Sequence, residues 1–349
     1  MRLRLVGDVV FTTPAIRALR RRFPDAAITY VVERPAAPVV RHHPDLHEVI
    51  ELERPRGLRR LRYDLAMARR LRAARFDLAI DFHGGPRSSL LVRASGAPRR
   101  IGYAIPGRRW AYTERVPWHP DLVPPRHSVR NQWDLLAPLG IDDPDPERDP
   151  VTMRPGPATA ARVAARLHAA GVSDDAAVAV LHVSASNPFR RWPRTAFAEV
   201  AAALAAADAR RRIIITAGPS EADAAQAITA DARARAGSAA AAIVCDDLSL
   251  EELSVVLERA ALFIGGDSGP LHVAATTPVP IVALFGPTLP ERSMPWRHPA
   301  LSAVALEPGP LSCRPCHQRT CVPGDFRCLT SIPPHAVIAA ATSLLEGRS

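Results

Sequence analysis

Short apolar runs rich in β-branched residues alternate with alanine-rich stretches through the second half of the chain. This rhythm restricts the fold more than any other feature, because it is the pattern of repeated βαβ units. Each run is apolar almost throughout, so both of its faces should be buried, as in a parallel sheet covered by helices. We expect strands at 178–183, 212–216, 241–245, 261–265 and 281–285. The second half is therefore predicted to form a doubly wound α/β domain.

The first half has a similar but less regular rhythm. Thr13 followed by Pro14 predicts a helix start, with the hydroxyl as N-cap and the proline in the first turn. The expected helices and strands of this half lie at about 14–22, 27–32, 58–75 and 78–82.

Proline and charged residues crowd the segment 142–157, which suits neither a helix nor a strand interior. A chain of 349 residues, 47% of them hydrophobic, also exceeds what one core usually holds. We therefore expect two domains, 1–150 and 151–330.

The chain carries a net charge of +10, and all 45 of its basic residues are arginine. This charge suits an anionic partner such as nucleic acid, an acidic membrane surface or a phosphorylated glycan. Drift toward arginine codons in a GC-rich genome explains it equally well. Nucleic acid is disfavoured because the arginines are scattered, aromatic residues make up 5%, and no known nucleic-acid motif is present.

The start MRLRLVGDVV has no apolar core of a signal peptide, and no apolar run approaches the roughly 20 residues that span a bilayer. We expect a cytoplasmic protein that rests on a membrane face.

The segment GGDSGPLH, residues 265–272, joins a predicted strand to a predicted helix. Its glycines allow close approach of a ligand, and the helix start offers N–H groups to a phosphate. Ligands bind at this edge of α/β sheets. An ordinary turn capped by Asp267 or Ser268 explains the same residues, so the loop alone does not decide.

The longer stretch GGDSGPLHVAATTPVPIVALFGPT resembles the signature of glycosyltransferase family 9, the ADP-heptose:lipopolysaccharide heptosyltransferases, and the likeness extends over nearly the whole chain. It implies that Asp267, Ser268, Gly269 and His272 surround the diphosphate and sugar of the donor. It also implies a GT-B architecture: two Rossmann-like domains facing a cleft, with a C-terminal helix at 331–349 that crosses back.

HVSASNPFRRWPRTAFAEVAAAL resembles the family segment that binds donor phosphates. The family's hydroxyl residue falls on Ser186 and its lysine on Arg190. Arginine keeps the charge and can bind phosphate through two N–H groups, but it is not equivalent to a compact ammonium. A solvated arginine pair beside a packed Trp192 is the alternative.

Two further donor residues follow from the resemblance. Glu221, in ITAGPSEADAAQAI, falls where ribose or adenosine hydroxyls are bound, although a glutamate at a helix start also complements the helix dipole. Leu248, in DDLSLEEL, falls where an apolar residue packs near the adenine, and core packing explains a leucine equally well.

VGDVVFTTPAIRALRRRFPDAAITYVV resembles the family's opening motif, whose aspartate is the proposed general base that deprotonates the acceptor hydroxyl. That role falls on Asp8, for which a turn or cap role is the alternative. The family has a full apolar strand before this motif, whereas MRLRLV alone precedes Gly7. Either the true start lies upstream of Met1, or a short strand weakens the first domain.

DFHGGPRSSLLVRASGAPRRIGY resembles the family segment near the acceptor. It places Asp81, His83 and Arg87 at the acceptor, where Arg87 could bind a phosphate or carboxylate of the inner sugars. A buried, satisfied His83 and a solvated Arg87 are the alternative.

Four of the five cysteines, Cys313, Cys316, Cys321 and Cys328, lie in one short segment. Their spacing fits tetrahedral zinc, and a structural clip or reduced thiols fit as well.

The resemblance thus implies an inverting transferase that moves a heptose or related sugar from an ADP-sugar to the anionic lipid A and inner-core glycan. It implies no required cofactor and a peripheral position at the cytoplasmic face of the inner membrane. Two rivals stay open: an epimerase-like nucleotide-sugar enzyme with two Rossmann domains, and a catalytically silent sugar-binding protein.

Overall fold

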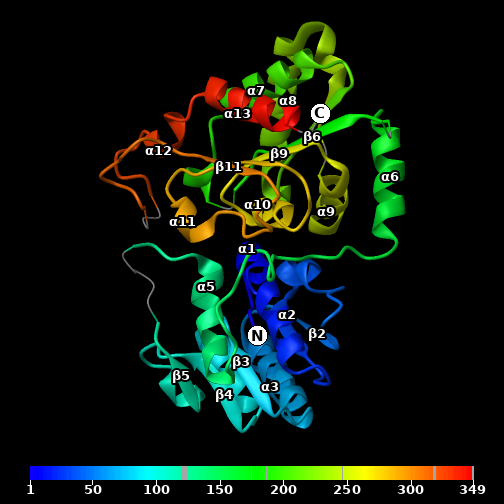
Figure 1. Ribbon diagram of the computed structural model, residues 1–349. Helices are drawn as coiled ribbons and strands as arrows, with labels where there is room; N and C mark the ends of the chain where they lie inside the picture. The colour runs from blue at the N-terminus through cyan, green and yellow to red at the C-terminus, as the bar shows by residue number, and fades with distance from the viewer. Residues whose placement is uncertain (119–123, 174, 186, 246, 317–319, 348–349) are drawn as a thin grey trace. The chain divides into compact units, whose positions relative to one another are not determined.

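The computed structural model describes residues 1–349 except 119–123, 174, 186, 246, 317–319 and 348–349. The chain divides into two compact units, unit 1 (Met1–Arg154) and unit 2 (Pro155–Ser349), shown in Figure 1. The division falls within the proline- and charge-rich segment 142–157. Each unit is an α/β structure whose paired strands run parallel.

Unit 2 contains a six-stranded sheet in the order β11-β10-β9-β6-β7-β8. The first strand of the unit lies in the middle, and the chain winds outward to one side and then to the other, as in Rossmann folds. The five strands expected here are confirmed, with small shifts at their ends. The strand bounds are β6 (Ala177–His182), β7 (Arg211–Thr216), β8 (Ile243–Cys245), β9 (Leu262–Gly266), β10 (Ile281–Leu284) and β11 (Ala303–Leu306).

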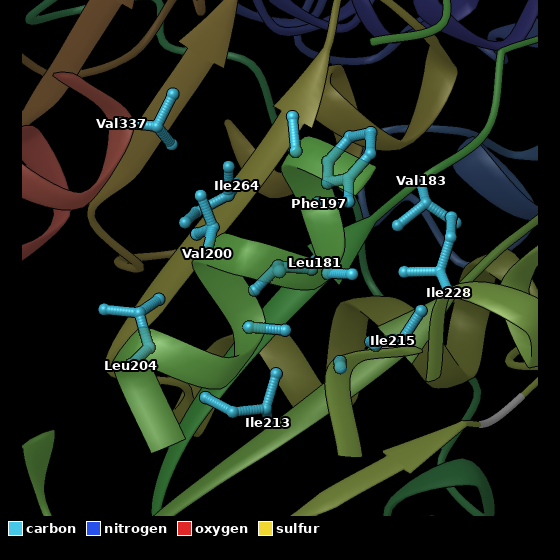
Figure 2. Packing of buried hydrophobic residues seen from close by; sticks show 14 of the residues in the cluster. Leu181, Val183, Phe197, Val200, Leu204, Ile213, Ile215, Ile228, Ile264 and Val337 are labelled. Atoms are coloured by element: carbon cyan, nitrogen blue, oxygen red, sulfur yellow. The ribbon is translucent and has the colours of Figure 1, made fainter. Parts of the chain in front are cut away.

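Helices cover the sheet of unit 2, and α7 supplies much of the core (Figure 2). Phe197, Val200 and Leu204 of α7 are buried in one cluster with Leu181 of β6 and Ile264 of β9. Burying each such side chain is worth about 1.5–3 kcal/mol. The helices and 3₁₀ turns are α6 (Thr159–Ala169), η4 (Pro188–Arg190), α7 (Arg194–Ala207), η5 (Pro219–Glu221), α8 (Ala222–Ala236), η6 (Gly237–Ala242), α9 (Leu250–Arg259), α10 (Gly269–Ala274), α11 (Pro290–Ser293), α12 (Arg327–Thr330) and α13 (Pro334–Glu346).

The C-terminal helix α13 packs into the same core. Its Val337 and Ala341 are fully buried within the cluster that contains α7. Trp192, just before α7, donates from its indole nitrogen to the carbonyl of Ile332 at 3.0 Å. The helix expected at 331–349 is therefore anchored to unit 2.

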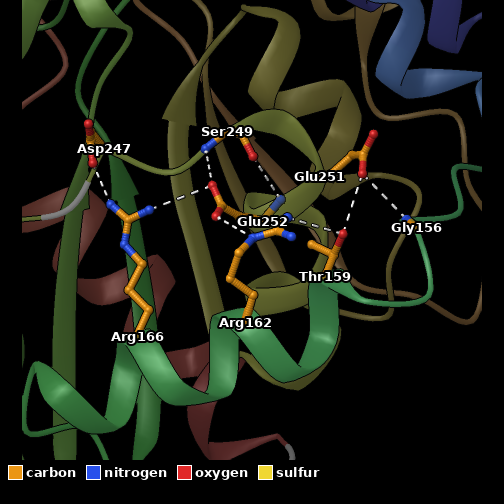
Figure 3. Close-up of polar contacts among 8 residues, drawn as sticks. All are labelled: Gly156, Thr159, Arg162, Arg166, Asp247, Ser249, Glu251 and Glu252. Carbon is orange, nitrogen blue, oxygen red and sulfur yellow. Dashed lines mark hydrogen bonds and ion pairs between the residues drawn. The ribbon is translucent and has the colours of Figure 1, made fainter.

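A polar network joins α6 to the start of α9 (Figure 3). Ser249 caps α9 by accepting from the Glu252 N–H at 3.3 Å, and the Glu252 carboxylate accepts from the Ser249 N–H at 3.0 Å. This reciprocal pair is a capping box. Arg162 and Arg166 of α6 lie 3.3 and 3.6 Å from the same carboxylate. The network fixes the start of α9 directly after Leu248.

Glu252→Gln is expected to lower the free energy of unfolding by about 1 kcal/mol at pH 7. Burial raises the pKa of Glu252, but its bonds to Ser249, Arg162 and Arg166 outweigh burial and bring the pKa below its ordinary value. A carboxylate with a lowered folded-state pKa stabilises above the unfolded-state pKa, and this contribution is lost as the pH falls through the folded value. Urea unfolding should therefore show a parent–variant difference that shrinks between pH 7 and pH 4.

Glu258→Gln on the same helix is the matched control. Burial raises the pKa of Glu258, so removing its charge near the helix C-terminus should cost no stability. A Glu252→Gln variant as stable as the parent at pH 7, or a difference that grows on acidification, contradicts this role of the network.

Unit 1 has shorter strands and more irregular connections. The expected helices and strands of this half are confirmed, while strands with charged residues, such as β2 and β4, were not predicted. The elements are α1 (Val6–Val10), α2 (Thr13–Arg22), β1 (Thr29–Glu33), η1 (Arg34–Val39), β2 (Glu48–Leu52), α3 (Leu58–Ala73), β3 (Leu78–Asp81), α4 (Pro86–Ala94), β4 (Arg99–Tyr103), η2 (Arg109–Ala111), β5 (Glu114–Val116), α5 (Ser128–Trp133) and η3 (Asp134–Leu139).

Residues 1–3 connect the two strand sets of unit 1, β1-β2 and β3-β4-β5. On one side, Arg2 N–H donates to a carbonyl of β1 at 3.2 Å, and a β1 N–H donates to the Leu3 carbonyl at 2.9 Å. On the other side, the N–H of Phe82 after β3 donates to the Met1 carbonyl at 2.9 Å. The short segment before Gly7 therefore occupies the centre of a second Rossmann-like strand order.

Thr13 does not cap α2, contrary to the sequence expectation. The helix begins at Thr13 itself, Thr12 is the N-cap, and neither hydroxyl makes a cap hydrogen bond. Instead, the Thr13 hydroxyl donates to the Val10 carbonyl of α1 at 2.8 Å. The preceding helix α1 supplies that acceptor, and the sequence pattern gave no sign of α1.

Candidate functional site

The strand order of unit 2 predicts a ligand site at the carboxyl ends of β6 and β9. The chain leaves these adjacent strands toward opposite sides of the sheet, and ligands bind in the crevice at such a switch point. Arg190 follows β6 and Asp267 follows β9. Glu221 follows β7 and Leu248 follows β8, so these predicted donor residues all lie at the carboxyl-terminal end of the parallel strands.

Asp267 lies between two cationic or proton-donating partners. Its carboxylate oxygens are 3.4 Å from Nη1 of Arg190 and 3.4 Å from Nε2 of His272. Burial raises the pKa of Asp267, but the contacts with His272, Arg190 and Thr288 outweigh burial, so the pKa lies below its ordinary value. Asp267 is therefore a buried carboxylate that orients Arg190 on one side and His272 on the other.

Ser268 and Gly269 complete the loop after β9. The Ser268 hydroxyl is buried and, among the described residues, has no hydrogen-bond partner, so it can accept or donate a bond to a ligand. Gly269 begins α10, which is six residues long. Such a short helix offers a weak dipole, so the side chains of the loop must supply most of the attraction for an anion.

The second glycine of this loop determines how closely Arg190 approaches. A Cβ added at Gly266 would lie 3.2 Å from the Arg190 carbonyl oxygen. The absence of a side chain lets η4 pack directly against the end of β9. This close approach brings the Arg190 guanidinium to Asp267.

Glu221 is buried and forms an ion pair with Arg191. Arg191 is held in turn by a 2.9 Å hydrogen bond from its Nε to the Ala185 carbonyl. Sequence reasoning selected Arg190 and missed Arg191. The two consecutive arginines before Trp192 were the signal that could have indicated it. Leu248 is partly buried and directly precedes Ser249, the N-cap of α9.

Ser186 lies outside the described residues. A second hydroxyl in the same segment, Ser184, accepts from the Gly218 N–H at 2.9 Å and lies 3.0 Å from Nε2 of His182. Burial lowers the pKa of His182 to about 4, so its ring is neutral at pH 7. Ser184 and His182 were not predicted, and they fix the turn that leads to Glu221.

In unit 1, Asp8 lies in the first turn of α1, directly after the central segment 1–3. Its side chain is 29% exposed, so a substrate can reach it, and it forms an ion pair with Arg2. Arg2 also donates from Nη1 to the Phe82 carbonyl at 2.5 Å. Arg2 therefore fixes the direction of the Asp8 carboxylate, a contact that sequence spacing did not suggest.

Asp81 is the last residue of β3, and His83 lies in the turn that follows this strand. Burial and the nearby charge of Arg2 lower the pKa of His83 to about 4, so this ring is neutral at pH 7. Asp81 is fully buried and accepts from the N–H groups of His83 and Gly84, both at 3.0 Å, and from the Tyr112 hydroxyl at 2.7 Å. Asp81 thus shapes the turn that presents His83.

Arg87 is engaged in internal ion pairs. Its guanidinium lies 2.6 Å from Asp64 of α3 and 3.6 Å from Glu33 of β1, and its side chain is 11% exposed. The alternative of a solvated Arg87 is therefore wrong. Binding of the acceptor by Arg87, Asp81 and His83 stays a prediction.

The cysteine segment holds four free thiols. Burial, followed by the charges of Cys321, Cys313 and Cys316, raises the pKa of Cys328. Within the described part of the chain, no group of three or more His, Cys, Asp or Glu residues is arranged to hold a metal ion. Zinc binding by this segment stays a prediction.

The described helices include none that is both long and apolar enough to cross a membrane.

Comparison with known proteins identifies the family. The family model of glycosyltransferase family 9 (heptosyltransferase) matches residues 65–326. Lipopolysaccharide heptosyltransferase 3 of Escherichia coli is 28% identical over 347 residues, which cover 98% of this chain and 97% of that protein.

Solved structures agree on the fold. The glycosyl transferase family 9 structure from Veillonella parvula DSM 2008 has a TM-score of 0.82 at 23% identity, covering 99% of this chain and 95% of that one. The E. coli ADP-heptose lps heptosyltransferase II structure has a TM-score of 0.77 at 20% identity, covering 100% and 99%. The expected GT-B class with two Rossmann-like domains is confirmed. The chain belongs to glycosyltransferase family 9, the heptosyltransferase family.

Proposed function

We propose that this protein is an inverting glycosyltransferase that moves a heptose or a closely related sugar from an ADP-sugar to the inner core of lipopolysaccharide. The observation that carries the proposal is the buried Asp267 carboxylate flanked by Arg190 and His272 at the switch point of unit 2. The names of the relatives support the substrates: one is a lipopolysaccharide heptosyltransferase and another is called an ADP-heptose enzyme.

Unit 2 binds the donor in this proposal. Arg190 pairs with the diphosphate, and the Ser268 hydroxyl, which no described residue bonds, donates to it together with the hydroxyl of Ser186. Glu221, oriented by Arg191, accepts from the ribose hydroxyls. The adenine packs beside Leu248. Gly269 and His272 contact the diphosphate and the sugar.

Unit 1 provides the base. Asp8 takes the proton from the acceptor hydroxyl while that oxygen attacks the anomeric carbon of the heptose. The bond from this carbon to the diphosphate breaks with inversion, and ADP leaves with the electron pair. Arg190 stabilises the negative charge that develops on the diphosphate. The reaction as proposed uses the ADP-sugar as substrate and needs no cofactor. His83 contacts the acceptor glycan in this proposal, and Asp81 and Arg87 lie beside it on the acceptor side of unit 1.

The proposed acceptor is anionic and anchored in lipid, so the proposal includes a peripheral position of the enzyme at the cytoplasmic face of the inner membrane. The net charge of +10 supports this location.

Release of ADP from ADP-heptose, with and without a truncated lipopolysaccharide acceptor, tests the proposed function. We expect release that depends on the acceptor. Equal release without acceptor favours an epimerase-like enzyme or a hydrolase. No release by folded protein with any donor and acceptor pair favours the catalytically silent sugar-binding protein and overturns the proposal.

A further inference from the structure

Helix α3 displays three leucines to solvent. Leu58, Leu61 and Leu65 are 80%, 70% and 50% exposed. Their spacing places them along one side of the helix. On the opposite side, Met67 and Leu71 are buried in a core cluster of unit 1. The exposed leucines are therefore not needed to hold α3 on its sheet.

Arginines surround this apolar stripe. Seven exposed arginines lie between residues 56 and 72, while α3 contains one carboxylate, Asp64. Arg62 and Arg69 stand four and eleven residues after Leu58, so they flank the leucines on the same side of the helix. Two of the seven, Arg60 and Arg70, form ion pairs with Asp64 and Glu48. The leucine face itself therefore combines exposed apolar side chains with the positive charges of Arg62 and Arg69.

We propose that this face of α3, formed by Leu58, Leu61, Leu65, Arg62 and Arg69, docks the protein on the headgroup region of an anionic lipid bilayer. A helix with such a face lies in the plane of the interface, where its leucines enter the acyl boundary and its arginines pair with lipid phosphates. The negative surface potential of such a bilayer complements the arginines.

The docking face is linked to the predicted acceptor side of unit 1. Asp64 of α3 forms the 2.6 Å ion pair with Arg87, which follows the turn that presents His83. Docking through α3 would therefore hold this turn close to a lipid-anchored glycan. This advantage for catalysis rests on the proposed function, whereas lipid binding itself does not.

Flotation of the full-length protein with vesicles of phosphatidylcholine, with and without phosphatidylglycerol, tests the proposal. The parent should bind the anionic vesicles far better than the neutral ones. The triple variant Leu58→Gln/Leu61→Gln/Leu65→Gln should lower the partition coefficient about tenfold or more. Glutamine is chosen because its helix propensity is close to that of leucine.

Arg62→Gln/Arg69→Gln should lower binding to anionic vesicles about tenfold or more, since each basic residue near such a surface contributes about 1 kcal/mol. Matched controls remove equally exposed groups from unit 2: Val322→Gln for the leucines and Arg210→Gln/Arg235→Gln for the charges. Both controls should bind like the parent, and circular dichroism should show unchanged helix content in every variant.

Three results overturn the proposal: a parent that binds no vesicles, a parent that binds neutral and anionic vesicles equally, or a leucine variant that binds like the parent. Activity measured with a lipid-free core oligosaccharide as acceptor distinguishes failure of this proposal from failure of the proposed function. The leucine variant should keep parental activity on that soluble acceptor, whereas failure of the proposed function leaves parent and variant equally inactive there.

Discussion

Replacing Asp8 with asparagine is expected to lower kcat by about 10²–10⁴-fold, the usual contribution of a general base. Asparagine has nearly the same shape and can still contact the Arg2 guanidinium, but it cannot accept the proton of the acceptor hydroxyl. Because the proposed donor residues lie in unit 2, the affinity for ADP-heptose should stay at the parental value. Steady-state kinetics together with calorimetric titration of the donor separate these two effects.

Asp25→Asn is the matched control, because Asp25 is an exposed carboxylate elsewhere in unit 1. It should leave kcat unchanged. An Asp8→Asn enzyme whose kcat stays close to that of the parent contradicts the assignment of the base, and so does a variant that fails at donor binding.

Replacing Arg190 with alanine is expected to lower kcat/KM by about 10–100-fold, since a hydrogen bond to a charged group is worth about 1.5–3 kcal/mol. The loss has two parts: the diphosphate loses its cation, and Asp267 loses the partner that lies 3.4 Å away. Arg190→Lys should recover part of the activity because lysine keeps the charge but not the two-pronged geometry.

Arg194→Ala removes an exposed arginine at the start of α7 and should have no effect. Product inhibition by ADP provides the second readout. Arg190→Ala should weaken it in parallel with kcat/KM, and unchanged ADP inhibition in that variant places the diphosphate elsewhere.

Strand positions in unit 2 were predictable because its sheet is buried on both faces. The central strands there are apolar almost throughout, as in β6 and β9. The strands of unit 1 were harder to find because residues such as Glu48 in β2 and Arg99 in β4 interrupt the pattern. β11 was missed for a different reason: it is a four-residue strand at the edge of the sheet, and its residues are only partly buried.

The donor side of the site was easier to predict than the contacts that orient it. The loop from Gly265 to His272 can be recognised in the sequence by its glycines and by its position after a predicted strand. The pairs Arg2–Asp8 and Arg191–Glu221 do not, because each joins residues that only the fold brings together. Local spacing carries no information on such contacts.

The acceptor side shows the reverse problem. The family resemblance suggested acceptor contacts for Asp81 and Arg87, yet both side chains bind neighbouring groups of unit 1 in the structure. A sequence pattern does not distinguish a polar residue that meets a ligand from one that shapes the turn beside it. Among the three predicted acceptor residues, His83 lies near the charges of both Arg2 and Asp8.

Analysis of the product tests the central claim most directly. The protein is incubated with ADP-heptose and a truncated lipopolysaccharide acceptor, and the acceptor is then examined by mass spectrometry and by NMR of the new anomeric centre. The account predicts one added heptosyl residue per ADP released, with inverted anomeric configuration, and no product from Asp8→Asn. An unmodified acceptor in the presence of folded parent protein, or a product with retained configuration, contradicts it.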